Sequence, residues 1–336
     1  MTHFPAVFRS MSLPLALGVV LGAGCSIDNN VERRTQTDVF LQEPNAEVDV
    51  LWVVDDSPSM AEEQALLAAG FESFIAGIEE TNVDFHIGVI STDMDLTNPN
   101  RGVLVGEPAY LTAEDDYISL FQERVTVGTE GSDKEKGLSA AVHALTEPLA
   151  SGPNLGFLRP MATLLLIFVS DEDDCSDGDA LEGLDGGACY SQREELIPVK
   201  QFVTDFQNIK GPGARVVASS IVGPEVIDAC DDSWPGHRYA TIAEITGGVQ
   251  GDICEVSYEE LMADMGLAVG AEVRVFQLSY TPVEETLEVY VGEEEILEDP
   301  VNGWTYDSEF QNIRFDGDYY PPRGSSLSVT YEINNI

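Results

Sequence analysis

Between residues 48 and 278, apolar runs of strand length alternate with amphipathic segments of helical length, and this alternation constrains the fold most strongly. Residues 48–54 (VDVLWVV) and 163–169 (TLLLIFV) are nearly continuous β-favouring runs, typical of strands buried on both faces. After the first run, Leu67, Phe71 and Ile78 recur at helical spacing. Strands that alternate with helices predict an α/β fold: a doubly wound, mainly parallel sheet of Rossmann-like type.

The alternation of strands and helices continues to residue 278, and a pattern typical of antiparallel strands follows it. Further strands are predicted at residues 83–90, 214–222 and 273–278, and further helices at residues 138–145, 202–209 and 258–268. After about residue 280, apolar and polar residues alternate at 287–291 and 327–333, with turn signals between them. We therefore expect an α/β domain over residues 46–279 and a small C-terminal all-β appendage over residues 280–336.

The first 25 residues resemble a bacterial lipoprotein signal peptide. Residues 11–23 form an apolar run too short to span a bilayer as a helix. The run leads into Cys25, which would carry the lipid, although Gly22 stands where the usual signal has leucine. Residues 26–45 are polar and without periodicity, so a tether is predicted there. These features predict export as an outer-membrane lipoprotein facing the periplasm or the cell surface; ordinary secretion and an uncleaved anchor are the alternatives.

The charge balance restricts the partners. Asp and Glu number 60 against 16 Lys and Arg, which gives a formal net charge of −44. A surface of this sign repels nucleic acid and anionic lipid and attracts cations. We therefore expect no nucleic-acid partner, and contact with the membrane only through the N-terminal lipid.

Four cysteines remain if Cys25 is lipidated: Cys175, Cys189, Cys230 and Cys254. An even number in an exported chain indicates disulfides. Among the three pairings, Cys175–Cys189 with Cys230–Cys254 closes the shortest loops and is the one we predict. Each such loop would stabilise the fold by roughly 3 kcal/mol in the chain-entropy model. Zinc ligation is the rival interpretation, but the sequence contains no CxxC motif and only four histidines.

Oxygen-bearing side chains follow the predicted strands where ligands gather in a parallel sheet, at the carboxyl ends. Asp55, Ser57 and Ser59 follow the first strand, Asp171 follows the central strand, and Ser132 precedes a helix. Carboxylates and hydroxyls suit a hard cation such as Mg²⁺. The alternative is that the first turn only caps the helix after it.

This Asp-x-Ser-x-Ser turn, with the other two loops in order, resembles the metal-ion-dependent adhesion site of von Willebrand factor A (VWA) domains. The resemblance covers residues 46–279. It implies that Ser132 replaces a threonine ligand of the family, with Thr129 as the second choice, and that Asp171 is the matching carboxylate of the last loop. Glu172 stands where the family has glycine and could add a carboxylate near the metal.

The resemblance implies one divalent cation, Mg²⁺ first, with Mn²⁺ and Ca²⁺ as alternatives. Asp93 ends the second predicted strand and could reach the site from outside the ligand set.

For Asp173, Asp174, Asp177 and Asp179 we expect a solvated acidic loop rather than a second, calcium-type site, because their spacing matches no calcium-loop consensus.

The resemblance further implies a binding protein, in which a carboxylate from an envelope or extracellular protein completes the metal's coordination. An enzyme is not expected, because the sequence lacks the HExxH, phosphate-loop and GxSxG motifs of hydrolases. His86 and His143 fall inside predicted elements and are expected to pack there. The alternatives are a structural envelope protein with a vestigial metal site and a metal-assisted hydrolase.

Overall fold

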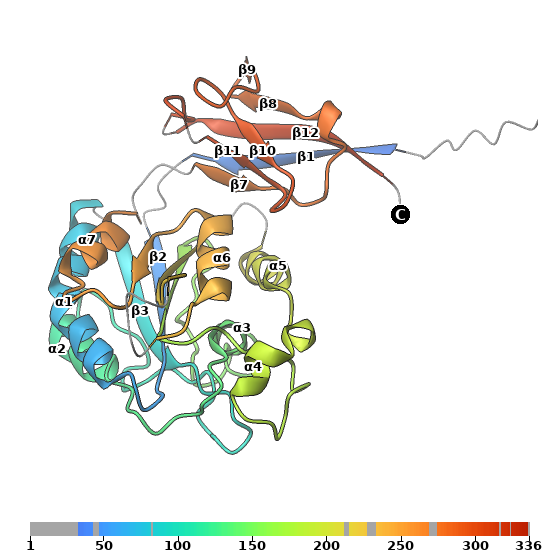
Figure 1. Ribbon diagram of the computed structural model, residues 1–336. Helices are drawn as coiled ribbons and strands as arrows, with labels where there is room; N and C mark the ends of the chain where they lie inside the picture. The colour runs from blue at the N-terminus through green and yellow to red at the C-terminus, as the bar shows by residue number, and fades with distance from the viewer. Residues whose placement is uncertain are drawn as a thin grey trace, which may run out of the picture.

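A five-stranded parallel sheet with helices on both faces forms the larger part of this computed structural model (Figure 1). The structure describes residues 33–42, 47–81, 83–211, 215–226, 233–268, 274–315, 317–322 and 324–334. The strand order is β3 (Asp84–Ser91), β2 (Glu47–Val54), β4 (Thr163–Ser170), β5 (Val216–Val222) and β6 (Gln250–Asp252). Every neighbouring pair is parallel, which confirms the predicted α/β class and parallel sheet.

The apolar side chains of β2 divide between two cores, one on each face of the sheet. Val50 and Trp52 point into one core, and Leu51 and Val53 into the other; all four are fully buried. The first core is closed by α1 (Ala61–Thr81), α2 (Tyr117–Arg124) and α7 (Glu259–Ala268), the second by α3 (Gly137–Leu145), α5 (Val199–Lys210) and α6 (His237–Thr246). Burial on both faces explains why the strand reads as a continuous apolar run.

Two small antiparallel sheets pack face to face beside the α/β domain (Figure 1). One sheet has the order β1 (Arg33–Leu41), β12 (Ser326–Asn334), β8 (Glu288–Val291) and β9 (Glu294–Ile296). The other has the order β10 (Thr305–Asp307), β11 (Asn312–Arg314) and β7 (Val275–Gln277). Side chains from both sheets, including Phe276, Ile313, Leu327 and Val329, share one core. The antiparallel β structure predicted after residue 280 is therefore present, as a two-layer sandwich.

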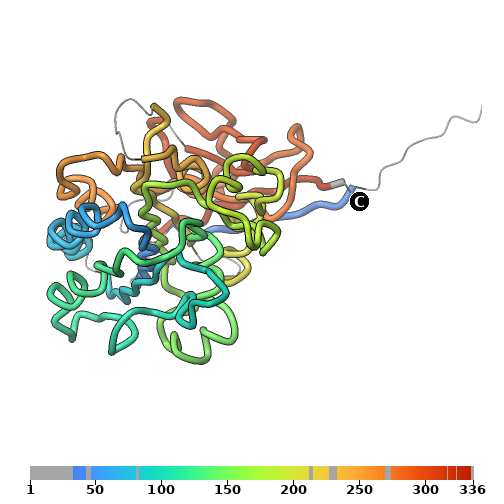
Figure 2. Tube along the Cα trace, turned by 60° about the horizontal axis from the view of Figure 1, so that its bottom comes forward, coloured from blue at the N-terminus to red at the C-terminus, as the bar shows by residue number. Residues whose placement is uncertain are grey.

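Residues 33–41, which we expected to belong to a tether, form β1 instead. All nine pair antiparallel with β12, from Arg33 opposite Asn334 to Leu41 opposite Ser326. Figures 1 and 2 both show the blue strand lying along the red one. The prediction of a tether was wrong here because β1 buries little apolar surface, and Asp38 is its one buried residue. Residues 1–32 and 43–46, with the predicted signal peptide and Cys25, lie outside the described residues.

The segment predicted as the final strand of the parallel sheet also has a different place. Its described part contains β7, which pairs antiparallel with β11 in the sandwich, Phe276 opposite Ile313. Phe276 packs there against the rings of Phe40 and Phe315. The apolar run was recognised correctly as a strand, but its sequence does not reveal which sheet it joins.

One of the two predicted disulfides is confirmed, that between Cys175 and Cys189. Cys254 is also a disulfide cysteine, and Cys230, its predicted partner, lies outside the described residues. The first bond holds α4 (Gly187–Ser191), which is followed by the short 3₁₀ helix η1 (Arg193–Glu195). A second 3₁₀ helix, η3 (Glu284–Thr286), precedes β8.

The sandwich meets the α/β domain at the end where the parallel strands begin. The Asn312 side-chain amide donates to the backbone carbonyl of Ile245 at 3.4 Å, near the last turn of α6. The loops at the carboxyl ends of the parallel strands therefore lie at the opposite end, away from the sandwich (Figure 1). Within the described part of the chain, no helix combines the length and the apolar character that crossing a bilayer requires.

Candidate functional site

Asp55 lies directly after β2 and is fully buried at the carboxyl edge of the sheet. One carboxylate oxygen accepts the backbone N–H of Ser57 at 2.7 Å, and the other accepts the hydroxyl of Ser170 at 2.6 Å. The hydroxyl oxygens of Ser57 and Ser59 are 3.2 Å apart. The side chain of Gln64 donates to the carbonyls of Asp55 and Gly128, so that α1 fixes this turn against the loop before α3. The turn is thus ordered around the carboxylate of Asp55.

The loop carrying Thr129 and Ser132 lies against the same turn. The backbone N–H of Gly131 donates to the carbonyl of Asp56 at 2.8 Å. A Cβ at residue 131 would come within 2.2 Å of the Asp56 carboxylate, so only glycine allows this approach. Ser132 is half-buried, and its hydroxyl accepts the backbone N–H of Lys134 at 3.1 Å. Thr129 is also half-buried.

Glu135 is a buried carboxylate of this loop that the sequence analysis did not single out. It is 1% exposed. The hydroxyl of Thr92, at the end of β3, donates to its Oε2, and its Oε1 has no hydrogen-bond partner among the described residues. Burial raises the pKa of Glu135 well above its usual range, and the nearby Asp55 raises it further, against the lowering effect of Thr92. Glu135 belongs to a charged run, Asp133 to Lys136. Because such runs usually face solvent, its burial could not be predicted from the sequence.

Asp171 and Glu172, after β4, complete the carboxylate group. Asp171 is 5% exposed, and with burial it raises the pKa of Asp55. Burial and the charges of Asp55, Asp171 and Asp133 raise the pKa of Glu172 to about 7. The charge of Asp55 thus acts on Glu135 and Glu172, and that of Asp171 acts on Asp55 and Glu172.

Asp93 lies at the margin of this group. It forms an isolated β-bridge with Glu135, and its carboxylate accepts the backbone N–H of Asp95 and the side-chain amide of Asn98. Burial and the charge of Asp93 raise the pKa of Asp56 to about 6. Asp93 thus acts on the turn through Asp56.

The acidic loop after Asp171 is not the solvated loop that we expected. Asp173, Asp174 and Asp177 are at most 5% exposed; Asp179 is exposed. Asp174 accepts the backbone N–H of Leu138 at the start of α3 and pairs with Arg238 of α6 at 2.9 Å. These carboxylates are buried because they bond to residues distant in sequence, and a local sequence pattern cannot reveal such partners.

The remaining carboxylates of this loop are held in the same way. Asp177 pairs with Lys136 at 2.6 Å, and this contact with a cation helps to lower its pKa against the effect of burial. Asp173 accepts the backbone N–H of Arg238 at 2.8 Å, while burial raises its pKa to about 6. These residues fix the loop and cap α3, so we assign them a structural role.

The oxygens at the carboxyl edge are of the chemical type that a hard divalent cation prefers. They belong to the carboxylates of Asp55, Glu135 and Asp171 and the hydroxyls of Ser57 and Ser59, which is the chemistry that Mg²⁺, Mn²⁺ and Ca²⁺ prefer. Carboxylates buried together repel one another, and a cation would relieve that repulsion. No group of three or more His, Cys, Asp or Glu side chains poised to hold a metal occurs among the described residues. A cation here would therefore depend on the serine hydroxyls and on water.

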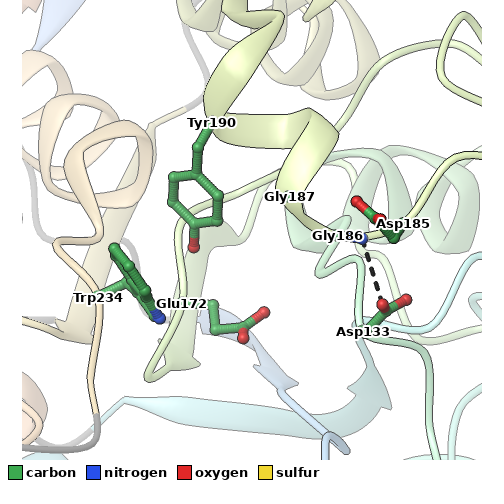
Figure 3. Close-up of a pocket in the computed structure, with 7 residues that line it drawn as sticks. All are labelled: Asp133, Glu172, Asp185, Gly186, Gly187, Tyr190 and Trp234. Carbon is green, nitrogen blue, oxygen red and sulfur yellow. Dashed lines mark hydrogen bonds between the residues drawn. The ribbon is translucent and has the colours of Figure 1, made fainter.

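A pocket of about 410 Å³ opens beside this edge (Figure 3). Its lining residues are Asp133, Glu172, Asp185, Gly186, Gly187, Tyr190 and Trp234. The backbone N–H of Trp234 donates to the carbonyl of Asp171 at 2.7 Å, and Glu172 belongs to both the pocket and the carboxylate group. The pocket and the candidate metal site are therefore neighbours.

No family model matches this chain, and no curated protein matches it in sequence. Among solved structures, the pilus adhesin SpaC from Lactobacillus rhamnosus GG is 10% identical with a TM-score of 0.38, and the human COPII-coat protein Sec24c is 10% identical with a TM-score of 0.40. The tip pilin GBS104 from Group B Streptococcus agalactiae is 11% identical with a TM-score of 0.36.

Each of these alignments covers 89% of this chain. They span 41% of SpaC, 42% of Sec24c and 81% of GBS104, so the chain matches less than half the length of the first two. Likenesses this remote carry no argument about what the protein does.

Proposed function

We propose that this protein is a metal-dependent binding module of the VWA type, displayed on the bacterial cell envelope, which captures a partner protein through an acidic side chain. The observation that carries the proposal is the gathering of Asp55, Glu135 and Asp171 at the carboxyl edge of the sheet, beside the hydroxyls of Ser57 and Ser59. These residues come from three loops that are distant in sequence. A buried group of like charges is costly to a fold unless a bound cation compensates it.

The ligand set proposed for the cation includes Asp55, Ser57, Ser59 and Asp171, some direct and some through water. The third loop would contribute Glu135 or Ser132, of which Glu135 is the buried one. When bound, the cation supplies a positive centre that attracts a carboxylate from the partner. The proposed ligands Asp55, Ser57 and Asp171 are buried, whereas Ser59 is exposed.

Attachment to the envelope is the second part of the proposal. Lipid on Cys25 would place the sandwich near the outer membrane, because β1 begins only a few residues later, at Arg33. The loops that form the site lie at the far end of the α/β domain (Figure 1). A partner in the periplasm or outside the cell would then meet the site rather than the anchored end.

Calorimetric titration with Mg²⁺ and Mn²⁺ tests the metal site. Wild-type protein should bind one cation, and Asp55→Asn should bind it at least tenfold more weakly, because a charged ligand becomes a neutral one of the same shape. Glu72→Gln is the matched control, since Glu72 is exposed on α1 and its loss should leave the affinity unchanged. Equal affinity in wild type and Asp55→Asn would place the metal elsewhere.

Capture of envelope and extracellular proteins by immobilised wild-type protein tests the binding function. Capture that is saturable, abolished by EDTA and absent with Asp55→Asn supports the proposal. Capture that survives EDTA would instead indicate a structural protein with a vestigial metal site. Cation-dependent hydrolysis of a captured protein would favour the hydrolase.

A further inference from the structure

We propose that the pocket beside the carboxylate group binds an arginine side chain of the partner protein. The inference deepens the proposed protein-binding function and rests on it, but it does not require the metal. Recognition would then combine two features of one partner, an acidic side chain at the cation and an arginine next to it.

The walls of the pocket differ in chemistry across its width. Tyr190 and Trp234 lie on one side, with ring centroids 5.3 Å apart, while Asp133 and Asp185 lie on the other and Glu172 stands between (Figure 3). Aromatic faces attract cations through the ring quadrupole. Carboxylates opposite the rings supply acceptors for the N–H groups of the same cation.

Among cations, the guanidinium group fits this arrangement best. It is planar, so it can stack on a ring while its N–H groups donate sideways to carboxylates, and it is more weakly hydrated than an ammonium group. The protein already contains one such contact: Arg193 lies 5.9 Å from the centroid of the Tyr190 ring without lining the pocket. A volume of about 410 Å³ leaves room for an entering side chain.

The aromatic wall is exposed yet firmly held. Trp234 is 53% exposed, whereas its backbone N–H is bonded to Asp171. The hydroxyl of Tyr190 accepts the backbone N–H of Asp173 at 3.3 Å, and the Cys175–Cys189 disulfide anchors the helix that bears Tyr190. A large exposed aromatic side chain on an ordered backbone is typical of binding anchors, because little flexibility is lost on binding.

Titration of the intact protein with the peptide acetyl-Gly-Arg-Gly-amide tests the proposal, in EDTA and 0.15 M NaCl. Calorimetry should show saturable binding. Tryptophan fluorescence should change along with it, because Trp52 and Trp304 are at most 5% exposed and Trp234 is the accessible reporter. The same peptide with citrulline, which has the shape of arginine without its charge, should not bind, and a lysine peptide should bind more weakly.

Variants locate the binding. Trp234→Leu should weaken binding of the arginine peptide about two- to fivefold, the range expected for an exposed cation–aromatic contact. Asp185→Asn should weaken it by up to about fivefold, the range expected for an exposed ion pair. Glu182→Gln is the matched control, because Glu182 is an exposed carboxylate of the same loop that does not line the pocket. With a net charge of −44, the protein attracts cations in general, and this control separates that attraction from the pocket.

Three results would overturn the proposal: no saturable binding, binding of the citrulline or lysine peptide as tight as that of the arginine peptide, or an effect of Glu182→Gln as large as that of Asp185→Asn. Because EDTA is present throughout, loss of the metal site cannot cause any of them. Arginine binding in a protein that fails to bind Mg²⁺ would refute the metal part of the proposed function and leave the pocket standing.

Discussion

The protonation of single buried carboxylates governs the chemistry of the candidate site. Burial and mutual repulsion raise the pKa of Asp55, Glu135 and Glu172, the last to about 7. A carboxyl group with a raised pKa in the folded state binds more protons when folded than when unfolded. Its contribution to stability is therefore present at low pH and is lost as the pH rises through the folded-state pKa.

The free energy of unfolding of the metal-free protein should fall as the pH rises from about 5 to 7.5. Mg²⁺ should raise the melting temperature more at pH 7.5 than at pH 5, because its ligands must be deprotonated to bind it. Thermal unfolding in EDTA and in Mg²⁺ across this range measures both effects. Glu135→Gln should flatten the metal-free profile, since one of the titrating carboxyl groups is gone. A metal-free protein that is more stable at pH 7.5 than at pH 5 would contradict the prediction.

Sequence reasoning reached part of this site. Asp55 and Asp171 could be identified because each directly follows an apolar strand, and strand ends converge at one edge of a parallel sheet. Glu135 could not be identified in this way. Its burial depends on Thr92, at the end of another strand, and this contact joins residues 43 positions apart.

At the scale of elements, β1 pairs with β12 along its whole length and buries one polar residue, Asp38, in the sandwich. Asp38 is 7% exposed and accepts the hydroxyl of Tyr331 at 2.7 Å and the backbone N–H of Ser279 at 2.8 Å. These two bonds join β1 to β12 and to the segment after β7. The hydrogen bonds of Asp38 thus help to hold β1 in the sandwich, whereas apolar packing holds the buried parallel strands.

Tyr331→Phe should lower the free energy of unfolding by about 1–3 kcal/mol, because it removes the hydrogen bonds of the Tyr331 hydroxyl with the buried carboxylate of Asp38 and with the backbone N–H of Tyr280. Chemical denaturation, followed by a signal from the sandwich such as the fluorescence of Trp304, measures the loss. Thr37→Val is the matched control: the Thr37 hydroxyl lies 3.0 Å from that of Thr330 in an exposed cross-strand pair. Its removal should change stability by less than about 0.5 kcal/mol. Equal effects of the two substitutions would show that the buried hydrogen bonds of Tyr331 contribute no more than the exposed pair.

The elements that sequence reasoning predicted are those whose burial leaves a local signal. The central strand β4 and the helix α1 show continuous or helical apolar periodicity. β1 shows neither, since eight of its nine residues are exposed or half-buried, and its partner β12 is nearly 300 positions away. The sheet that β7 joins was equally hidden, because its partner β11 lies in a separate segment.

At the scale of the whole molecule, the dominant feature is self-repulsion. The formal net charge of −44 destabilises any compact state, and the size of this effect depends on the distance over which the charges repel one another. Screening shortens that distance from about 10 Å at 0.1 M salt to about 3 Å at 1 M salt.

The melting temperature of the metal-free protein should therefore rise between 0.1 M and 1 M NaCl. KCl should act equally, because screening does not depend on which monovalent cation is present. Millimolar MgCl₂ should stabilise wild type beyond its ionic strength, and Asp55→Asn should lose this excess while keeping the response to NaCl. A melting temperature that stays constant or falls in NaCl would show that the charges are already compensated within the fold.

The pairing of β1 with β12 also bears on the order in which the parts of the protein fold. During synthesis β1 emerges before any other described strand, and its partner emerges after all of them. A lone strand is not stable in water, and Val39 and Leu41 are more than half exposed even in the finished sheet. The α/β domain can complete its core from residues 47–268 before β1 has a partner strand. We therefore expect closure of the sandwich to be the final step of folding, and a chain interrupted before β12 to keep an open strand that other chains can pair with.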